Sequence, residues 1–264
     1  MKQAWFTLMA AGSFAAVAHA APIDLSSWTE LTLNFPGGQA AGNWALKPGN
    51  TVVVQEINAD PSFYLNNLNQ TKFSMDGSWK AGADGDDDYM GFVFGYQNSS
   101  QFYLFDWKQG TQNYVGTTAA EGMTIKKFTG ATGDGLVDLG LDEMWENETD
   151  FGDMEVLATN HGSTKGWVDN KSYDFHLDFN QVAGEFSIIV KDGATELWNV
   201  TVADSTYTGG QFGFYNYSQS QVEYAGFVQT GGVPVGTGVP DSGSALALFA
   251  FGLAGLVVAG KRRS

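Results

Sequence analysis

Cysteine is absent from the 264-residue sequence, which excludes several kinds of structure and chemistry. Without cysteine there is no disulfide framework, no thiolate nucleophile and no cysteine-ligated zinc site. Proline is also scarce, with 6 residues, whereas glycine is frequent, with 34, and aromatic residues make up 14% of the chain. This composition is typical of a folded, glycine-punctuated domain and not of a disordered or coiled-coil chain.

Basic residues are also scarce relative to acidic ones. Between residues 21 and 238 there are 28 acidic residues against 9 lysines and no arginine, which gives this part of the chain a net charge of −19. Such a surface repels phosphate backbones, so nucleic acid is excluded as a partner. The same charge attracts cations, and Ca²⁺ is therefore the first cofactor that we expect.

The N-terminus has the pattern of a secretory signal. Lys2 precedes an uncharged apolar run from Ala4 to Ala18, and the run ends in Ala18-His19-Ala20, a small-x-small sequence of the kind that signal peptidase accepts. We expect residues 1–20 to be a signal peptide that is removed after Ala20. The alternative is an uncleaved anchor.

The C-terminus has three parts that follow a linker over residues 231–238. They are Val239-Pro240-Asp241-Ser242-Gly243, an uncharged stretch from Ser244 to Gly260, and the basic end Lys261-Arg262-Arg263. Seventeen helical residues at ~1.5 Å each span ~26 Å, the lower limit for crossing a membrane. The basic end would stay cytoplasmic by the positive-inside rule, which places everything upstream outside the inner membrane.

This tail resembles the PEP-CTERM class of sorting signals, in the Val-Pro-Asp-Ser-Gly variant that an exosortase recognises in Gram-negative bacteria. The resemblance implies transient anchoring in the inner membrane through Ser244 to Gly260 and cleavage near Val239 to Gly243. It also implies release to the cell envelope or extracellular matrix. A permanent single-span anchor is the alternative.

Residues 21–230 are predicted to form one all-β domain. Short alternating or apolar runs bounded by Gly, Asn and Asp recur through it, without convincing helical periodicity. The strands that we expect are Thr51–Ile57, Tyr89–Tyr96, Phe102–Trp107, Tyr173–Phe179, Glu185–Lys191, Glu196–Val202, Gln211–Tyr217 and Glu223–Gln229. Turns at residues 98–100 and 191–194 predict hairpins, and strict alternation over Tyr173–Phe179 predicts one buried face. A sandwich of two antiparallel sheets follows.

A longer stretch of this domain indicates a family. A resemblance to the thrombospondin C-terminal domain is carried by the run Asp86-Asp87-Asp88-Tyr89-Met90-Gly91-Phe92-Val93-Phe94-Gly95-Tyr96-Gln97, with Phe102-Tyr103 and Trp107-Lys108-Gln109 after it. Further matches are Asn43-Trp44, Gln55, Asn58-Ala59-Asp60-Pro61, Gly166-Trp167, Lys171-Ser172-Tyr173, Gly209-Gly210, Gly213 and Ser218-Gln219. The resemblance covers roughly residues 43 to 227. It implies a concanavalin-type, L-type-lectin-like jelly-roll sandwich, bound calcium, and adhesion to an extracellular polysaccharide or surface protein.

The acidic run that opens this signature is the candidate calcium site. A Ca²⁺ ion takes six to eight oxygen ligands, and three adjacent carboxylates at a strand entry repel one another. No lysine lies between Lys80 and Lys108, so a cation would relieve the repulsion at Asp86, Asp87 and Asp88. At strand spacing Asp86 and Asp88 face one way and Asp87 the other. Two residues of another matched loop, Asn58 and Asp60, are expected to complete the ligand shell. A solvated acidic turn is the alternative.

The aromatic side chains of the signature could form either a sugar-stacking platform or a core. These residues are Phe92, Phe94, Phe102, Tyr103, Phe105 and Trp107. Alternating aromatics in a hairpin favour a core. A sugar site would instead use a loop aromatic such as Trp145 or Trp167.

A second acidic segment, Asp142 to Glu155, carries seven carboxylates and is expected to be a long surface loop or an edge. Retaining glycosidases need two carboxyl groups about 5 to 5.5 Å apart, which Glu148 and Asp150 could supply from one strand face. Their polar, loop-like flanks favour a non-enzymatic domain, and a secreted glycoside hydrolase is the alternative. The sequence has no His-Glu-x-x-His pattern, and His161 and His176 do not define a catalytic triad.

Overall fold

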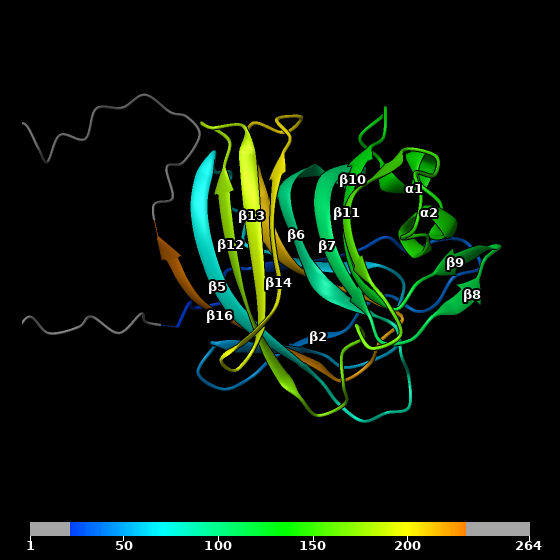
Figure 1. The fold of residues 1–264 in the computed structure, drawn as a ribbon, viewed down its shortest axis with the longest axis horizontal. Helices are drawn as coiled ribbons and strands as arrows, with labels where there is room; N and C mark the ends of the chain where they lie inside the picture. Colours follow the sequence, from blue (N-terminus) through cyan, green and yellow to red (C-terminus); the bar gives the residue numbers. More distant parts are fainter. Residues whose placement is uncertain (1–21, 231–264) are drawn as a thin grey trace, which may run out of the picture. The chain divides into compact units, whose positions relative to one another are not determined.

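Two seven-stranded antiparallel sheets form the domain in the computed structural model, which describes residues 22–230 (Figure 1). The first sheet has the spatial order β1 (Thr29–Thr32), β4 (Ser62–Leu65), β15 (Gln211–Tyr217), β6 (Tyr89–Asn98), β7 (Gln101–Lys108), β10 (Gly122–Thr129) and β11 (Met154–His161). The second has the order β14 (Thr195–Ala203), β13 (Glu185–Asp192), β12 (Ser172–Asn180), β5 (Lys72–Ala81), β16 (Val222–Thr230), β3 (Val52–Gln55) and β2 (Trp44–Leu46). The predicted all-β architecture of two antiparallel sheets is confirmed.

All eight strands expected from the sequence are present, and both predicted hairpins form, β6 with β7 and β13 with β14. The structure adds strands that the sequence pattern did not identify in β1, β2, β4, β5, β10 and β11. It also adds a small hairpin of β8 (Gln112–Tyr114) and β9 (Thr117–Ala119), and two short helices, α1 (Gly135–Asp138) and α2 (Leu141–Trp145).

The space between the sheets is filled mainly by aromatic rings. Trp79 of β5 stacks on Phe175 of β12 with ring centroids 4.8 Å apart, and Phe92 and Phe105 of the first sheet stack at the same separation. All six aromatic residues of the signature hairpin are at most 1% exposed. The prediction that they belong to the core is confirmed, and they offer no platform for a sugar.

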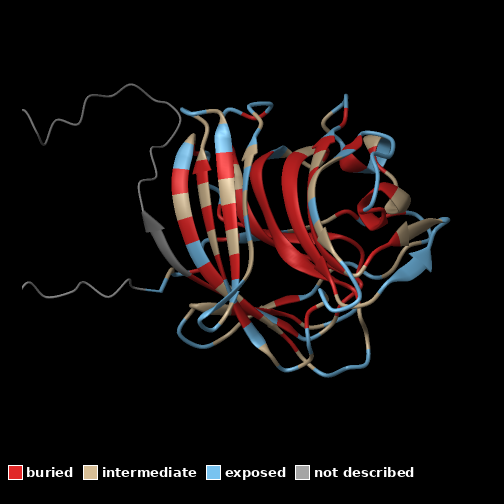
Figure 2. Cartoon of the chain, viewed as in Figure 1, coloured by how far each residue is buried: buried red, intermediate tan, exposed pale blue. Residues whose placement is uncertain are grey.

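A second apolar layer covers the outer face of the first sheet. Figure 2 shows β6 and β7 buried along nearly their whole length, whereas buried and more exposed residues alternate along β5, β12 and β13. The difference arises because Met144 and Trp145 of α2 belong to an apolar cluster on this outer face, where the Trp145 ring meets those of Tyr89 and Tyr217 edge to face. The outer face of the second sheet remains polar.

The second acidic segment departs from its prediction in its first half. Residues 143–147 are buried, and Leu141–Trp145 form α2. Residues 148–150 are exposed, and the strand that begins at Met154 forms an edge of the first sheet, as expected. The segment is buried because Met144 and Trp145 supply apolar surface to the second layer.

Within residues 22–230 no helix has the length and apolar character needed to cross a membrane. The predicted signal peptide, the sorting motif Val239–Gly243 and the hydrophobic stretch Ser244–Gly260 all lie outside the described residues.

Candidate functional site

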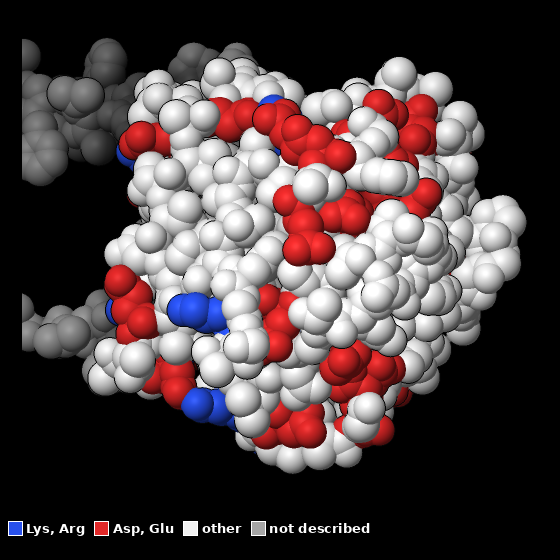
Figure 3. All heavy atoms as spheres, turned by 45° about the vertical axis from the view of Figure 1, so that its right-hand side comes forward, with Lys and Arg blue, Asp and Glu red and all other residues white. Residues whose placement is uncertain are grey.

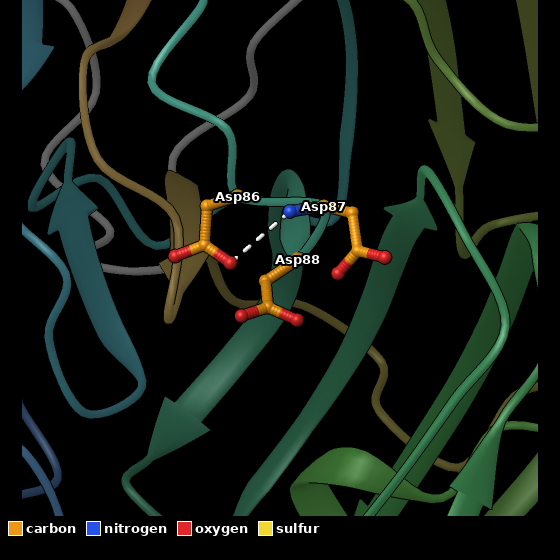
Figure 4. A group of neighbouring side chains, drawn as sticks. All are labelled: Asp86, Asp87 and Asp88. Atoms are coloured by element: carbon orange, nitrogen blue, oxygen red, sulfur yellow. Dashed lines mark hydrogen bonds between the residues drawn. The ribbon is translucent and has the colours of Figure 1, made fainter.

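The three consecutive aspartates converge where the chain enters β6 (Figure 4). One carboxylate oxygen from each of Asp86, Asp87 and Asp88 lies within 4.8 Å of the other two. Asp86 and Asp87 are half-buried, and Asp88 is 3% exposed. Because these oxygens are hard donors at close range, the cluster has the chemistry that Ca²⁺ prefers.

Lys108 already supplies one positive charge to this cluster. The lysine ends β7 directly opposite Tyr89, and its side chain is completely buried. Its Nζ lies 2.9 Å from Asp87 Oδ1 and 2.8 Å from Asp88 Oδ1, and it also donates to the backbone oxygen of Asp87 at 2.8 Å. The expectation that Asp87 and Asp88 face opposite ways is therefore wrong. They precede the regular strand, so its alternation does not constrain them.

The charge of the cluster is only partly neutralised. The three carboxylates carry a charge of −3 and Lys108 carries +1, which leaves the cluster with a net charge of −2. Burial raises the pKa of Asp88 to about 6, because the loss of solvation outweighs the attraction of the Lys108 ammonium. Burial therefore disfavours the ionised form of Asp88, and a further cation would stabilise that form.

The two residues expected to complete the site have different surroundings. Asn58 reaches the cluster, where its Nδ2 donates a hydrogen bond to Asp86 Oδ2. Asp60 is buried elsewhere and accepts hydrogen bonds from the backbone N–H groups of Phe35 and Gln39, both at 2.7 Å. Asp60 therefore holds the turn at residues 35–39, and the structure does not bring it into the cluster.

Asp84 and Gln219 form the polar border of the cluster. Gln219 Oε1 accepts a hydrogen bond from the Asp88 backbone N–H at 3.0 Å, and Gln219 Nε2 donates to Asp84 Oδ1 at 3.0 Å. Neither Gln219 nor Lys108 was predicted as a site residue. Both do belong to the quoted matches, Ser218-Gln219 and Trp107-Lys108-Gln109, which was the signal available in the sequence.

The loop over residues 162–171 is hydrogen-bonded to the part of the chain around Asp87 and Asp88. Trp167 Nε1 donates to the Asp88 carbonyl at 3.0 Å. Gln109 bridges the two parts, because its backbone N–H donates to Asp87 O at 3.0 Å and its Nε2 to Asp169 Oδ1 at 3.2 Å. Trp167 and Trp145 are each 1% exposed. The expectation that one of them offers a face to a sugar is therefore wrong.

The strand placement that the glycosidase alternative assumed for Glu148 and Asp150 is not found. Glu148 and Asp150 lie in the loop between α2 and β11, not on one strand face, and Asp150 Oδ1 accepts a hydrogen bond from the Val156 backbone N–H at 2.9 Å. His161 contacts Thr124 on the first sheet, whereas His176 contacts Asp76 on the second.

Acidic side chains also dominate the face drawn in Figure 3, where they form several patches and few lysine atoms are visible. The excess of acidic over basic side chains expected from the composition is thus visible on this face.

Comparison with known proteins identifies the domain. A family model described as the thrombospondin C-terminal region matches residues 39–230, which is most of the chain. The chain belongs to the thrombospondin C-terminal family. A second model, the VPDSG-CTERM motif, matches residues 238–263. Both resemblances seen in the sequence are confirmed.

Individual relatives are thrombospondins. The chain is 30% identical to thrombospondin-1 of Xenopus laevis over 189 residues, which is 69% of this chain and 16% of that protein. It is also 30% identical to thrombospondin-4-B of Danio rerio over 208 residues, which is 75% of this chain and 21% of that protein. The chain therefore spans about a fifth or less of the length of these relatives. The family match and these relatives are non-enzymatic binding modules, in agreement with the expectation of a non-enzymatic domain.

Solved structures with a similar outline include sugar-binding proteins. A carbohydrate-binding module, CBM66, from Bacillus subtilis has a TM-score of 0.49 at 15% identity, with 76% of this chain and 94% of that chain covered. The lectin UEA-II complexed with galactose has a TM-score of 0.47 at 9% identity, with coverages of 73% and 92%.

Proposed function

We propose that this thrombospondin C-terminal domain is a secreted, calcium-binding, lectin-like adhesion module of the cell envelope or extracellular matrix. Its partner is an extracellular polysaccharide or a surface protein. One observation carries the proposal: in a domain of this family, three carboxylates converge within 4.8 Å and their charge is only partly neutralised by Lys108.

The oxygens left free by Lys108 define how the cluster would hold the ion. Asp86, Asp87 Oδ2 and Asp88 Oδ2 are the carboxylate donors, because Lys108 occupies Oδ1 of both Asp87 and Asp88. Asn58 lies against Asp86, and with its amide turned it would present its oxygen to an ion held by Asp86. A divalent ion would neutralise the remaining −2 and tie Asp86 to the segment that holds the loop over residues 162–171.

A calcium titration of thermal stability tests this assignment. An ion that binds only the folded protein at a hundredfold excess over its Kd adds about 2.7 kcal/mol, and each kcal/mol raises the melting temperature of a domain this size by ~2 to 4 °C. We therefore expect a rise of several degrees between chelator and millimolar Ca²⁺. Asp86→Asn should remove most of the rise.

Asp174→Asn is the matched control, because Asp174 is an exposed acid on the second sheet. It removes the same charge and should leave the rise unchanged. An equal rise with Mg²⁺, or one that is insensitive to Asp86→Asn, would show that general screening of the acidic surface is responsible.

The ends of the chain supply the route to the cell exterior. We propose that residues 1–20 are removed as a signal peptide and that an exosortase acts at Val239–Gly243, in agreement with the VPDSG-CTERM match at residues 238–263. Ser244–Gly260 would then anchor the chain only transiently. Mass spectrometry of the surface-exposed protein should find a C-terminus within or just before the motif. Recovery of an intact Lys261-Arg262-Arg263 end would instead show a permanent anchor.

A further inference from the structure

The four edge strands of the sandwich differ in how they are protected against pairing with another chain. Within residues 22–230 the edges are β1 and β11 in the first sheet, and β14 and β2 in the second. An edge strand carries a row of backbone N–H and C=O groups without a strand partner, and short length, charged side chains or a covering segment protect such a row. β1 has 4 residues and β2 has 3, so both are too short to pair at length.

β11 is longer, with 8 residues, but acidic groups protect it. Asp150 Oδ1 accepts a hydrogen bond from the Val156 N–H at 2.9 Å, which occupies a backbone donor of this strand. The Glu155 side chain is 52% exposed, and Glu148 lies exposed beside the strand. The register also shifts where β11 pairs with β10, next to Lys126. A second acidic chain would be repelled from this edge.

β14 has none of these protections along most of its length. It has 9 residues and ends the second sheet, beside β13 (Figure 1). Residues 197–203 contain no charged residue and no proline, and the pairing with β13 is regular from Trp198 to Ala203. At the start of the strand, Asn160 Nδ2 donates to the Leu197 carbonyl at 3.1 Å. No side chain of the described residues bonds to the backbone of residues 199–203, so this edge is open.

The inner face of β14 is also incompletely covered. The apolar side chains that pack against the core from β14 are only half-buried, namely Trp198, Val200 and Val202. The residues opposite them on β13 are at most 1% exposed, namely Val190, Ile188 and Phe186. A further strand beside β14 would shield its apolar side chains as β14 shields those of β13.

A second copy of β14 meets the requirements for that further strand. Rotation about a two-fold axis perpendicular to the sheet places the strand antiparallel to itself, so its free N–H and C=O groups face those of the copy. The same rotation keeps apolar side chains on the inner face and polar ones on the outer face. Residues 21–238 carry a net charge of −19, so two copies can meet closely only where acids are absent, as over residues 197–203.

We propose that two copies of this chain associate by antiparallel pairing of β14, which continues the second sheet across both molecules. The proposal goes beyond the proposed function and depends on neither calcium nor the adhesion partner. One strand pair is a small interface beside the about 1,200 to 2,000 Å² of stable complexes, so association should depend on protein concentration. A dimer would present two adhesion modules to one surface and would thereby raise avidity.

Cross-linking through single cysteines tests the pairing. Because the chain has no cysteine, one introduced cysteine can form a disulfide only between chains or with a small thiol. Directly opposed residues of an antiparallel pair have Cα atoms about 4.5 to 5.5 Å apart, which suits a disulfide. A scan of residues 199–203 in the full chain, oxidised mildly, should therefore give disulfide-linked dimer with one maximum, at the residue on the two-fold axis. Thr159→Cys, exposed on β11, is the matched control and should remain monomeric.

Sedimentation of the full chain in mild detergent provides a second measurement. The wild type should shift from monomer to dimer as its concentration rises, and added salt should favour the dimer because it screens the repulsion between acidic copies. Asn199→Lys/Thr201→Lys should raise the Kd of the dimer about tenfold or more, because it places like charges across the contact. Thr159→Lys/Ser172→Lys adds the same charge at exposed positions of β11 and β12 and should not raise the Kd.

Thermal melts should show that all these variants remain folded. A flat profile across residues 199–203, or equal cross-linking through Thr159→Cys, would indicate random collision and overturn the proposal. A wild-type chain that stays monomeric at every concentration would also overturn it, as would a dimer that Asn199→Lys/Thr201→Lys leaves intact. Because none of these variants alters the acidic cluster, the calcium-induced rise in melting temperature should persist in each, and either proposal can fail without the other.

Discussion

Two segments of the chain are rich in acidic residues, and the structure uses their carboxylates in opposite ways. At residues 86–88 three carboxylates lie close together, and two of them, Asp87 and Asp88, pair with the ammonium of Lys108, which is 20 residues from Asp88 in the sequence. At residues 142–155 the buried carboxylates accept hydrogen bonds from the backbone of their own segment. Acidic density alone therefore does not indicate a cation site, whereas the partners of the carboxylates do.

In the second segment the buried carboxylates are held by backbone N–H groups. Glu143 accepts hydrogen bonds from the backbone N–H groups of Asp153 at 2.5 Å and Gly140 at 2.6 Å. Glu146 Oε1 accepts from the N–H groups of Glu148 at 2.8 Å and Thr149 at 3.1 Å. Each of these carboxylates closes a local turn, and the backbone N–H groups stabilise its charge. Burial still raises the pKa of Glu143, but both of its oxygens have backbone donors, and the buried Lys126 ammonium donates to the Met144 carbonyl of this segment at 2.9 Å.

Replacement of Lys108 should cause the largest change and should test this comparison directly. Lys108→Met leaves Asp87 and Asp88 without their buried partner, and such a loss costs about 3 to 5 kcal/mol. Urea unfolding in the presence of chelator should show this decrease in the free energy of unfolding. Ca²⁺ should recover more stability in this variant than in the wild type, because the cluster then carries −3.

Lys126→Met is the matched control for Lys108→Met. Lys126 is equally buried and pairs with buried Asp106 at 2.8 Å, on the next strand of the same sheet. Lys126→Met should lower the free energy of unfolding about as much as Lys108→Met does, but Ca²⁺ should restore no extra stability to it. Equal recovery in both variants would contradict a specific ion at Asp86–Asp88.

Glu143→Ala should have the next largest effect, and calcium should not alter it. The substitution leaves two backbone N–H groups without their acceptor, at about 1 to 3 kcal/mol for each one that stays buried and unsatisfied. Glu143→Gln keeps one acceptor oxygen and should cost less. Glu148→Gln, at an exposed position of the same segment, should stay within about 0.5 kcal/mol of wild type. A calcium-dependent loss in Glu143→Ala would show that the two segments are not distinct.

The strands that the sequence revealed are those with uninterrupted apolar or alternating runs, such as β6 and β12. The missed strand β5 is central to the second sheet and has the same alternation, with Phe73, Met75 and Trp79 buried. Its pattern is broken at Gly77. A side-chain carbon at that position would lie 2.3 Å from Phe175, so the neighbouring strand supplies the ring that the pattern lacks. Such compensation across strands is not visible in one segment of sequence.

The candidate site was predictable to a similar degree. The convergence of the aspartates and the nearness of Asn58 followed from the quoted motifs, whereas the separate role of Asp60 depends on the turn at residues 35–39. Lys108 was missed because its distance in sequence hides its place opposite Tyr89 in the β6–β7 hairpin. The register of the hairpin shifts between Phe94 and Asn98. The pairing of Tyr89 with Lys108 therefore could not be found by counting residues back from the turn.

A pH dependence of calcium binding would sharpen the same comparison. Burial raises the pKa of Asp88 to about 6. Without calcium, the folded protein therefore holds a proton there that the unfolded chain releases, and this contribution to stability is present at low pH and is lost as pH rises from about 4 to 6. Calcium binding requires the carboxylate. Its apparent affinity should thus fall about tenfold from pH 7 to pH 5, equivalent to about 1.4 kcal/mol. Melting temperatures with and without Ca²⁺ at each pH measure this difference, and Glu143→Gln, which removes a buried carboxyl of the second segment, should not change it. A calcium-induced rise that is the same at pH 5 and pH 7 would mean that Asp88 is not a ligand and that any ion is held by Asp86 and its exposed neighbours.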